Sequence, residues 1–188
     1  MQLLVITPEK PRKDEAEIIC ELLRMGVSRI HLRHPGQKAD VLRNIIVQIP
    51  LELRERLTLH DCFELTEEFP QLGININRRN PLEPSGPHGP VSRSCHSVSE
   101  TLLPADYCLL SPIFSSISKP GYAHEFTAEE LMSIPEGKVF ALGGICRERI
   151  AELKRYPFSG VAVLGAVWNQ DTDRADIINN VAKILEEL

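Results

Sequence analysis

Short apolar runs rich in β-branched residues alternate along the whole chain with segments whose apolar residues recur at helical spacing. Eight of these runs are candidate strands: "LLVIT", "VSRIHLRH", "RLTLHD", "LGININ", "VSRSCH", "DYCLLS", "KVFALGG" and "GVAVLGA". Between and after them, residues 16–23, the stretch "KADVLRNIIVQI" and residues 177–188 have the pattern of amphipathic helices. The alternation predicts parallel strands joined by crossover helices.

A (β/α)8 TIM barrel is the α/β fold that this pattern favours, since eight parallel strands can close and leave no sheet edge. The alternative is an open doubly wound sheet. The 188 residues are few for a barrel, which usually needs about 200. The stretch "NRRNPLEPSGPHGPV" has four prolines and two glycines, so we expect a loop to replace the helix after the fourth strand. Because no stretch has the composition of a linker between domains, residues 1–188 are interpreted as one slightly truncated barrel domain.

The composition argues against several classes of partner. A net charge of -5 gives no basic surplus for nucleic acid or an anionic membrane, so a small ligand is expected. Five cysteines without a C-x-x-C pair suit reduced thiols in a cytoplasm. No apolar run of 18 or more residues predicts a membrane span, and no export signal is recognised. Homo-oligomerisation is left open.

Polar residues gather where the candidate strands end, which in a barrel is the side that faces the substrate. A guanidinium such as that of Arg33 at the end of a buried strand is costly unless it meets an anion, and phosphate or pyrophosphate would suit it. Gly143 and Gly144 allow backbone N–H groups to approach phosphate oxygens, and "GVAVLG" offers a second such turn. The run "SSISK" adds hydroxyl groups and an ammonium, so this edge is predicted to bind anions.

Asp61 has two interpretations. It could cap a helix that begins near Cys62, or it could hold a hard cation such as Mg²⁺ together with substrate phosphates. The six histidines include no pair with metal-ligand spacing.

Taken in order, "HLRHP", "HDCFEL", "GININRRN", "SCHSVSE", "DYCLLSPIFSSISKPGY", "VFALGGI" and "GVAVLGAVW" resemble the thiamine phosphate synthase family, which includes thiazole tautomerases. The resemblance spans nearly the whole chain and is most specific from Asp106 to Gly121. It implies a (β/α)8 barrel that joins a pyrimidine pyrophosphate to a thiazole phosphate and releases pyrophosphate with the help of Mg²⁺.

The resemblance also implies site residues. Arg33 and Lys119 match the catalytic arginine and lysine on the pyrophosphate, and Asp61 matches a Mg²⁺-binding aspartate. The implied substrate-binding set consists of His31, His60, Ser94, Ser116, Ser118, Gly143, Gly144, Leu164 and Gly165. Within it, Ser116 and Ser118 replace two threonines on the thiazole phosphate side.

Several positions depart from the family pattern. His31 and Pro35 stand where the family has a glutamine and a lysine, and His60 replaces an asparagine. The second metal-binding aspartate is Asn80, so the Mg²⁺ site has lost a charge. We hypothesise that Arg78 or Arg79 compensates by binding pyrophosphate directly.

Three functions remain open from the sequence. The first is synthase chemistry, and the second is a paralogue that binds a phosphorylated heterocycle without turnover, as the missing lysine and aspartate suggest. The third is thiazole tautomerase activity, for which the family uses a histidine where this chain has Pro112. The "SPIF" form of that segment favours the synthase.

Overall fold

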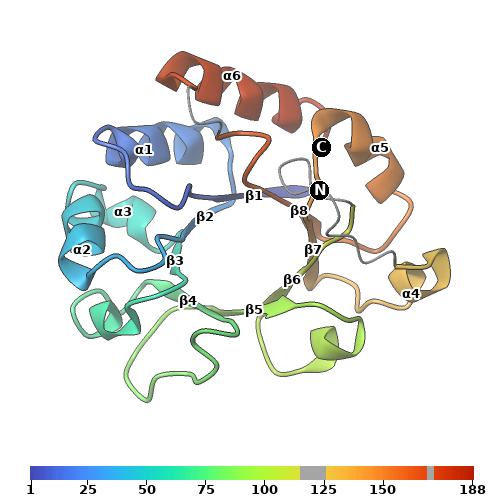
Figure 1. Ribbon diagram of the computed structural model, residues 1–188, viewed down its shortest axis with the longest axis horizontal. Coiled ribbons are helices and arrows are strands. Elements are labelled where there is room, and N and C mark those ends of the chain that lie inside the picture. The colour runs from blue at the N-terminus through green and yellow to red at the C-terminus, as the bar shows by residue number, and fades with distance from the viewer. Residues whose placement is uncertain (115–125, 169–171) are drawn as a thin grey trace.

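The computed structural model describes residues 1–114, 126–168 and 172–188. Within these ranges eight parallel strands form a closed barrel, in which each strand pairs with the next and β8 pairs with β1 (Figure 1). The strands are β1 (Gln2–Ile6), β2 (Arg29–Leu32), β3 (Leu57–Leu59), β4 (Gly73–Ile76), β5 (Val91–Cys95), β6 (Tyr107–Leu110), β7 (Val139–Leu142) and β8 (Gly160–Val163). The predicted TIM barrel is confirmed, and all eight candidate runs contain a strand.

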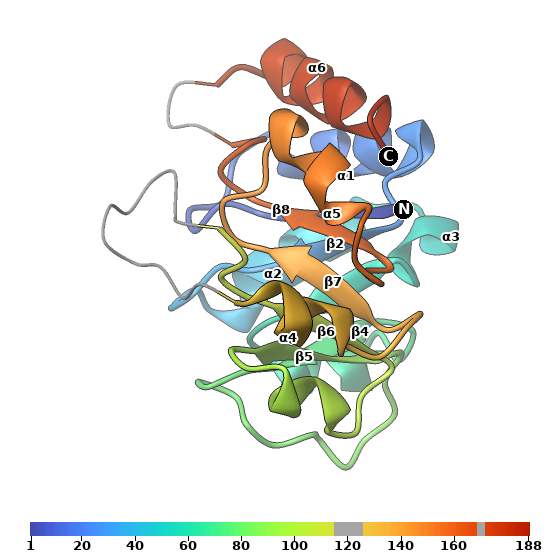
Figure 2. The same cartoon turned by 90° about the vertical axis from the view of Figure 1, so that its right-hand side faces the viewer.

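Helices surround the barrel and are seen from the side in Figure 2. They are α1 (Glu15–Met25), α2 (Ala39–Val47), α3 (Leu51–Arg54), α4 (Ala128–Met132), α5 (Ile150–Leu153) and α6 (Arg174–Leu185). Gly26 ends α1 in the left-handed conformation, with φ 112°, as a helix-terminating glycine does. Helix α6 packs beside α1, and the amine of Met1 donates to the carbonyl of Leu188 at 3.2 Å. The two ends of the described chain therefore lie together.

The barrel is shortened on one side. Between β4 and β5, where every residue is described, the chain forms a loop without a helix, which confirms the prediction from its prolines. The crossovers after β3 and β5 are also reduced, to 3-10 helices at Phe63–Glu67 and Ser99–Leu102. Of these three shortened crossovers, only the one between β4 and β5 was predicted from the sequence.

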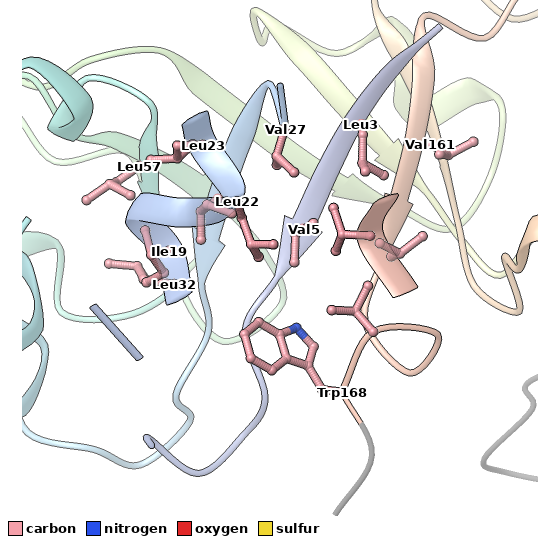
Figure 3. Packing of buried hydrophobic residues seen from close by; sticks show 14 of the residues in the cluster. Leu3, Val5, Ile19, Leu22, Leu23, Val27, Leu32, Leu57, Val161 and Trp168 are labelled. Atoms are coloured by element: carbon pink, nitrogen blue, oxygen red, sulfur yellow. The ribbon is translucent and has the colours of Figure 1, made fainter. Parts of the chain in front are cut away.

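The main hydrophobic core lies between the strands and the surrounding helices. Figure 3 shows part of it, where Leu22 and Ile19 of α1 face the strands and Trp168 lies beyond Val5. The indole nitrogen of Trp168 donates to the carbonyl of Ile6 at 2.8 Å, so this ring closes the junction between β8 and β1. A second, smaller cluster consists of Leu4, Ile6, Leu109, Phe140 and Ala162.

Two further features bear on the sequence predictions. In the described ranges, no helix is both long and apolar enough to cross a membrane. All five cysteines fall in these ranges, and each is a free thiol.

Candidate active site

Arg33 leaves the end of β2 at the rim of the barrel. Its backbone N–H donates to the hydroxyl of Thr7 at 2.9 Å, which ties the loop after β2 to the end of β1. The guanidinium Nη1 pairs with a carboxylate oxygen of Glu9 at 3.1 Å, and the Arg33 side chain is 25% exposed against 64% for Glu9. Because Glu9 is so exposed, this ion pair is weak, and an anion at the rim can compete for Arg33.

Asp61 follows the neighbouring strand β3. Its Oδ1 accepts from Nε of Arg79 at 3.1 Å, its Oδ2 accepts from Nη2 of Arg79 at 3.2 Å, and Asn80 Nδ2 donates to Oδ1 at 2.9 Å. The interpretation of Asp61 as a helix cap is wrong. The 3-10 helix that follows has Cys62 as its capping residue, with φ 57°, and no side-chain capping bond.

Behind this rim, two histidines form a buried pair inside the barrel. His31 Nδ1 and His60 Nε2 are 2.8 Å apart, and His31 Nε2 is 2.9 Å from the hydroxyl of Tyr107. His31 has no exposed surface and His60 is 5% exposed. Both ring nitrogens of His31 thus have protein partners, and this side chain lies beneath the mouth of the barrel. The expected substrate contact of His31 does not fit that position.

Burial keeps both imidazoles neutral. Desolvation, followed by the charge of His60 and then of Arg29, lowers the pKa of His31 well below its usual range. Desolvation also lowers the pKa of His60 to about 3, with a further contribution from Arg33. Neither histidine is therefore a cation for a phosphate at neutral pH.

The hydrogen bonds of this pair continue in both directions across β2 to β6. On one side, Asn75 Nδ2 lies 3.4 Å from His60 Nδ1 and donates to the hydroxyl of Ser94 at 3.0 Å. On the other, the Tyr107 hydroxyl lies 3.2 Å from the hydroxyl of Thr58. Ser94 and Tyr107 are thus the half-buried members of this polar chain, whereas His31, Thr58, His60 and Asn75 are buried.

Sequence reasoning missed Tyr107 and Thr58 as members of this network. The signal was the period of two along each strand, because Tyr107 shares its face of β6 with Leu109 of the inner cluster. Register then decides which inward residues meet: Thr58 pairs with His31 across β2 and β3.

On the opposite side of the mouth, the chain turns sharply after β7. Gly143 and Gly144 have φ 96° and 63°, which favour glycine. A Cβ at Gly143 would lie 2.8 Å from Cα of Pro112, so the turn packs directly on the segment after β6. Leu164, after β8, packs on the inner cluster, while a Cβ at Gly165 would meet no described residue within 4 Å.

The structure brings the rim residues of β2, β3 and β5 to one side of the mouth and the glycine turns to the other. Ser116, Ser118 and Lys119 lie outside the described residues. Among the described residues no group of three or more His, Cys, Asp or Glu side chains is arranged to hold a metal ion.

A family model described as thiamine monophosphate synthase matches residues 3–167, which is most of the chain. The chain belongs to this family. A thiamine-phosphate synthase from Chlamydia caviae is 24% identical, over 88% of this chain and 86% of its own length. Membership in the thiamine monophosphate synthase family makes the protein a transferase of the thiamine phosphate synthase type.

Solved structures agree with the family. The crystal structure of a thiamine phosphate pyrophosphorylase from Bacteroides thetaiotaomicron has a TM-score of 0.86 and 36% identity, covering 100% of this chain and 97% of that one. A thiamine phosphate pyrophosphorylase from Pyrococcus furiosus has a TM-score of 0.74 at 22% identity, covering 100% of this chain and 96% of that one, and supports the fold alone.

Proposed function

We propose that the protein joins hydroxymethylpyrimidine pyrophosphate to thiazole phosphate, giving thiamine phosphate and pyrophosphate. A bond forms between the thiazole ring nitrogen and the pyrimidine methylene carbon, while the bond from that carbon to the pyrophosphate oxygen breaks. Pyrophosphate leaves with the bonding electron pair, so no oxidant or reductant is needed. The observation that carries this proposal is the family match over residues 3–167.

Each side of the mouth has a separate task in this proposal. Arg33, Ser94 and Lys119 serve the pyrophosphate, because positive charge and hydroxyl donors stabilise the charge that develops as it leaves. Backbone amides near Gly143, Gly144, Leu164 and Gly165, with the hydroxyls of Ser116 and Ser118, serve the thiazole phosphate. The left-handed turn at Gly143 supports this second assignment, as does Gly165, where no described residue lies within 4 Å of a built Cβ.

Mg²⁺ stays a prediction that rests on the family. The two expected ligands do not fit it as they are arranged, because both oxygens of Asp61 accept from Arg79. The amide nitrogen of Asn80 faces two acceptors, the carbonyl of His60 and Asp61 Oδ1, so its oxygen points away from them. We therefore derive no step through a metal ion. Phosphate binding, a cytoplasmic location, a single domain over 1–188 and homo-oligomerisation also stay predictions.

The test is to incubate purified protein with both phosphorylated heterocycles, with and without Mg²⁺, and to measure thiamine phosphate by fluorescence after oxidation. Removing one electrostatic stabiliser of a transition state typically lowers the rate about 10² to 10³-fold, so Arg33→Ala and Lys119→Ala should each lose most product. Interconversion of thiazole tautomers without thiamine phosphate would instead favour a tautomerase. Absence of both reactions would favour the paralogue that only binds.

A further inference from the structure

The loop after β4 is fastened to the end of β3. Asn77 Nδ2 and Asn80 Nδ2 each donate to the carbonyl of His60 at 2.9 Å. Asn77 Oδ1 accepts from the backbone N–H of Arg79 at 3.0 Å and of Asn80 at 3.2 Å. The backbones of Asn77 and Asn80 also bond to each other in both directions at 3.1 Å. These bonds fix where Arg79 leaves the chain, next to Asp61.

The guanidinium of Arg79 holds Asp61 at two points, through Nε at 3.1 Å and Nη2 at 3.2 Å. Such a two-point contact fixes the plane of the guanidinium. It uses the Nε hydrogen and one Nη2 hydrogen, which leaves the two Nη1 hydrogens and the second Nη2 hydrogen for another acceptor. The Arg79 side chain is 46% exposed, whereas Asp61 is 16% exposed. The face of Arg79 away from Asp61 is therefore open to an anion.

The local charge is balanced without a metal ion. The family pattern of two aspartates and Mg²⁺ has no net charge, since two carboxylates offset a dication. Here Asn80 is neutral, and one carboxylate, Asp61, is offset by one guanidinium, Arg79. The loss of a carboxylate and the gain of an arginine thus compensate for each other at the same place.

Arg79 and Arg33 flank the end of β3 from either side. Arg33 follows β2 and Arg79 follows β4, so the two arginines lie on either side of His60, which follows β3. A pyrophosphate over this part of the mouth needs cations that remain charged at every physiological pH, which guanidinium groups do.

We propose that Arg79, held by Asp61, binds the pyrophosphate group in the position that the family gives to Mg²⁺, so that pyrophosphate binds here without a divalent metal. The inference rests on the proposed function, because it assigns the cation of that same site. Arg33 and Arg79 hold the pyrophosphate from two sides. Asp61 positions the Arg79 guanidinium and is not a metal ligand.

Inorganic pyrophosphate is the probe, titrated calorimetrically into the whole protein in excess EDTA. The wild type is expected to bind, and Arg79→Ala to bind at least about tenfold more weakly, since a hydrogen bond between charged groups is lost. Arg78→Ala is the matched control, because Arg78 is the exposed neighbour and has no ion pair with any described residue. Its affinity should change less than about twofold. Binding that requires Mg²⁺, or equal losses in the two variants, would overturn the inference.

Asn80→Asp gives a reciprocal test. A second carboxylate beside Asp61 leaves Arg79 unable to balance the local charge, so pyrophosphate binding in EDTA should weaken and added Mg²⁺ should restore it. Unchanged metal-free binding in this variant would contradict the charge argument.

The product assay tests the proposed function separately. Metal-free pyrophosphate binding that depends on Arg79, without thiamine phosphate formation, supports this inference and refutes the proposed function. Thiamine phosphate that forms only with Mg²⁺, and at the same rate in Arg79→Ala as in the wild type, supports the proposed function and refutes this inference.

Discussion

The interior of the barrel has two unlike halves. Strands β1, β6, β7 and β8 contribute an apolar cluster, which consists of Leu4, Ile6, Leu109, Phe140 and Ala162. Strands β2 to β5 contribute buried polar side chains, which include His31, Thr58, His60, Asn75 and Ser92. The apolar half lies below the glycine turns, and the polar half lies below Arg33 and Asp61.

The difference separates two ways of filling a barrel. The apolar half is stabilised by burial alone, which tolerates exchange of one hydrophobic shape for another. The polar half is stable only while each donor meets an acceptor, because an unpaired buried polar group costs about 1 to 3 kcal/mol. In return, it fixes the orientation of the strand ends that carry the proposed pyrophosphate site, since His60 is bonded both to His31 and, through its carbonyl, to Asn77.

The largest expected effect is the dependence of stability on pH that the two buried histidines of the polar half contribute. A histidine in an unfolded chain has a pKa of about 6.5, whereas burial lowers the pKa of His60 to about 3 and that of His31 well below its usual range. Below about pH 6.5 the unfolded chain binds protons that the folded chain does not, so this stability is present above that pH and lost as the pH falls. The loss should be about 1.4 kcal/mol per pH unit for each histidine.

Urea denaturation at several pH values measures this loss. The paired variant His31→Leu with His60→Leu is the control, because it keeps the carboxylates that also titrate and removes only the two imidazoles. Its free energy of unfolding should fall less steeply between about pH 6.5 and 4.5. Equal slopes in the two proteins, or imidazole NMR signals of the folded protein that titrate at the usual pH for histidine, would contradict the buried neutral pair.

The next effect belongs to the apolar half. Leu109 is fully buried, so Leu109→Ala should reduce the free energy of unfolding by about 2 to 5 kcal/mol through lost burial and the cavity that remains. Because the inner cluster contains no titratable group, the reduction should be the same at pH 7.5 and pH 5. A loss that changes with pH would show that the two halves are not independent.

The two halves also differ in how much of their structure could be predicted from the sequence. The eight strands follow from their apolar runs, and the missing helix follows from the prolines between β4 and β5. The side on which the polar residues meet depends on strand register, which pairs His31 with Thr58 and Asn75 with Ser92. No local pattern encodes that register.

The same limit applies at the site. Arg33 and Gly143 lie at strand ends, where the order of elements predicted them. The ion pair of Arg79 with Asp61 depends on how the loop of residues 77–80 folds back through Asn77. The sequence does not encode that fold-back, so it left open whether Arg78 or Arg79 faces the site.

A smaller effect is expected where the polar network ends against the apolar half. Tyr107→Phe removes the hydroxyl between His31 Nε2 and Thr58 Oγ1 but keeps the ring, which packs edge-on against Phe140 at a centroid distance of 5.6 Å. The free energy of unfolding should fall by about 1 to 3 kcal/mol, because His31 loses one partner in a dry interior. Thermal unfolding of the wild type and of Tyr107→Phe measures this loss of stability. An unchanged melting temperature would mean that the hydroxyl contributes nothing to the network.

The smallest expected effect on stability is that of Gly165→Ala at the rim above the apolar half, where Gly143 gives a matched comparison. Gly165→Ala places a methyl group where no described residue lies within 4 Å, so the melting temperature should not change. Gly143→Ala should destabilise by at least about 1 to 2 kcal/mol, because its φ of 96° alone opposes a Cβ and the contact of 2.8 Å with Cα of Pro112 adds to that cost. If thiazole phosphate binds beside Gly165, the harmless methyl group should still raise its KM several-fold. An unchanged KM in Gly165→Ala would move the thiazole phosphate away from the loop after β8, while leaving the pyrophosphate side of the mouth as it is.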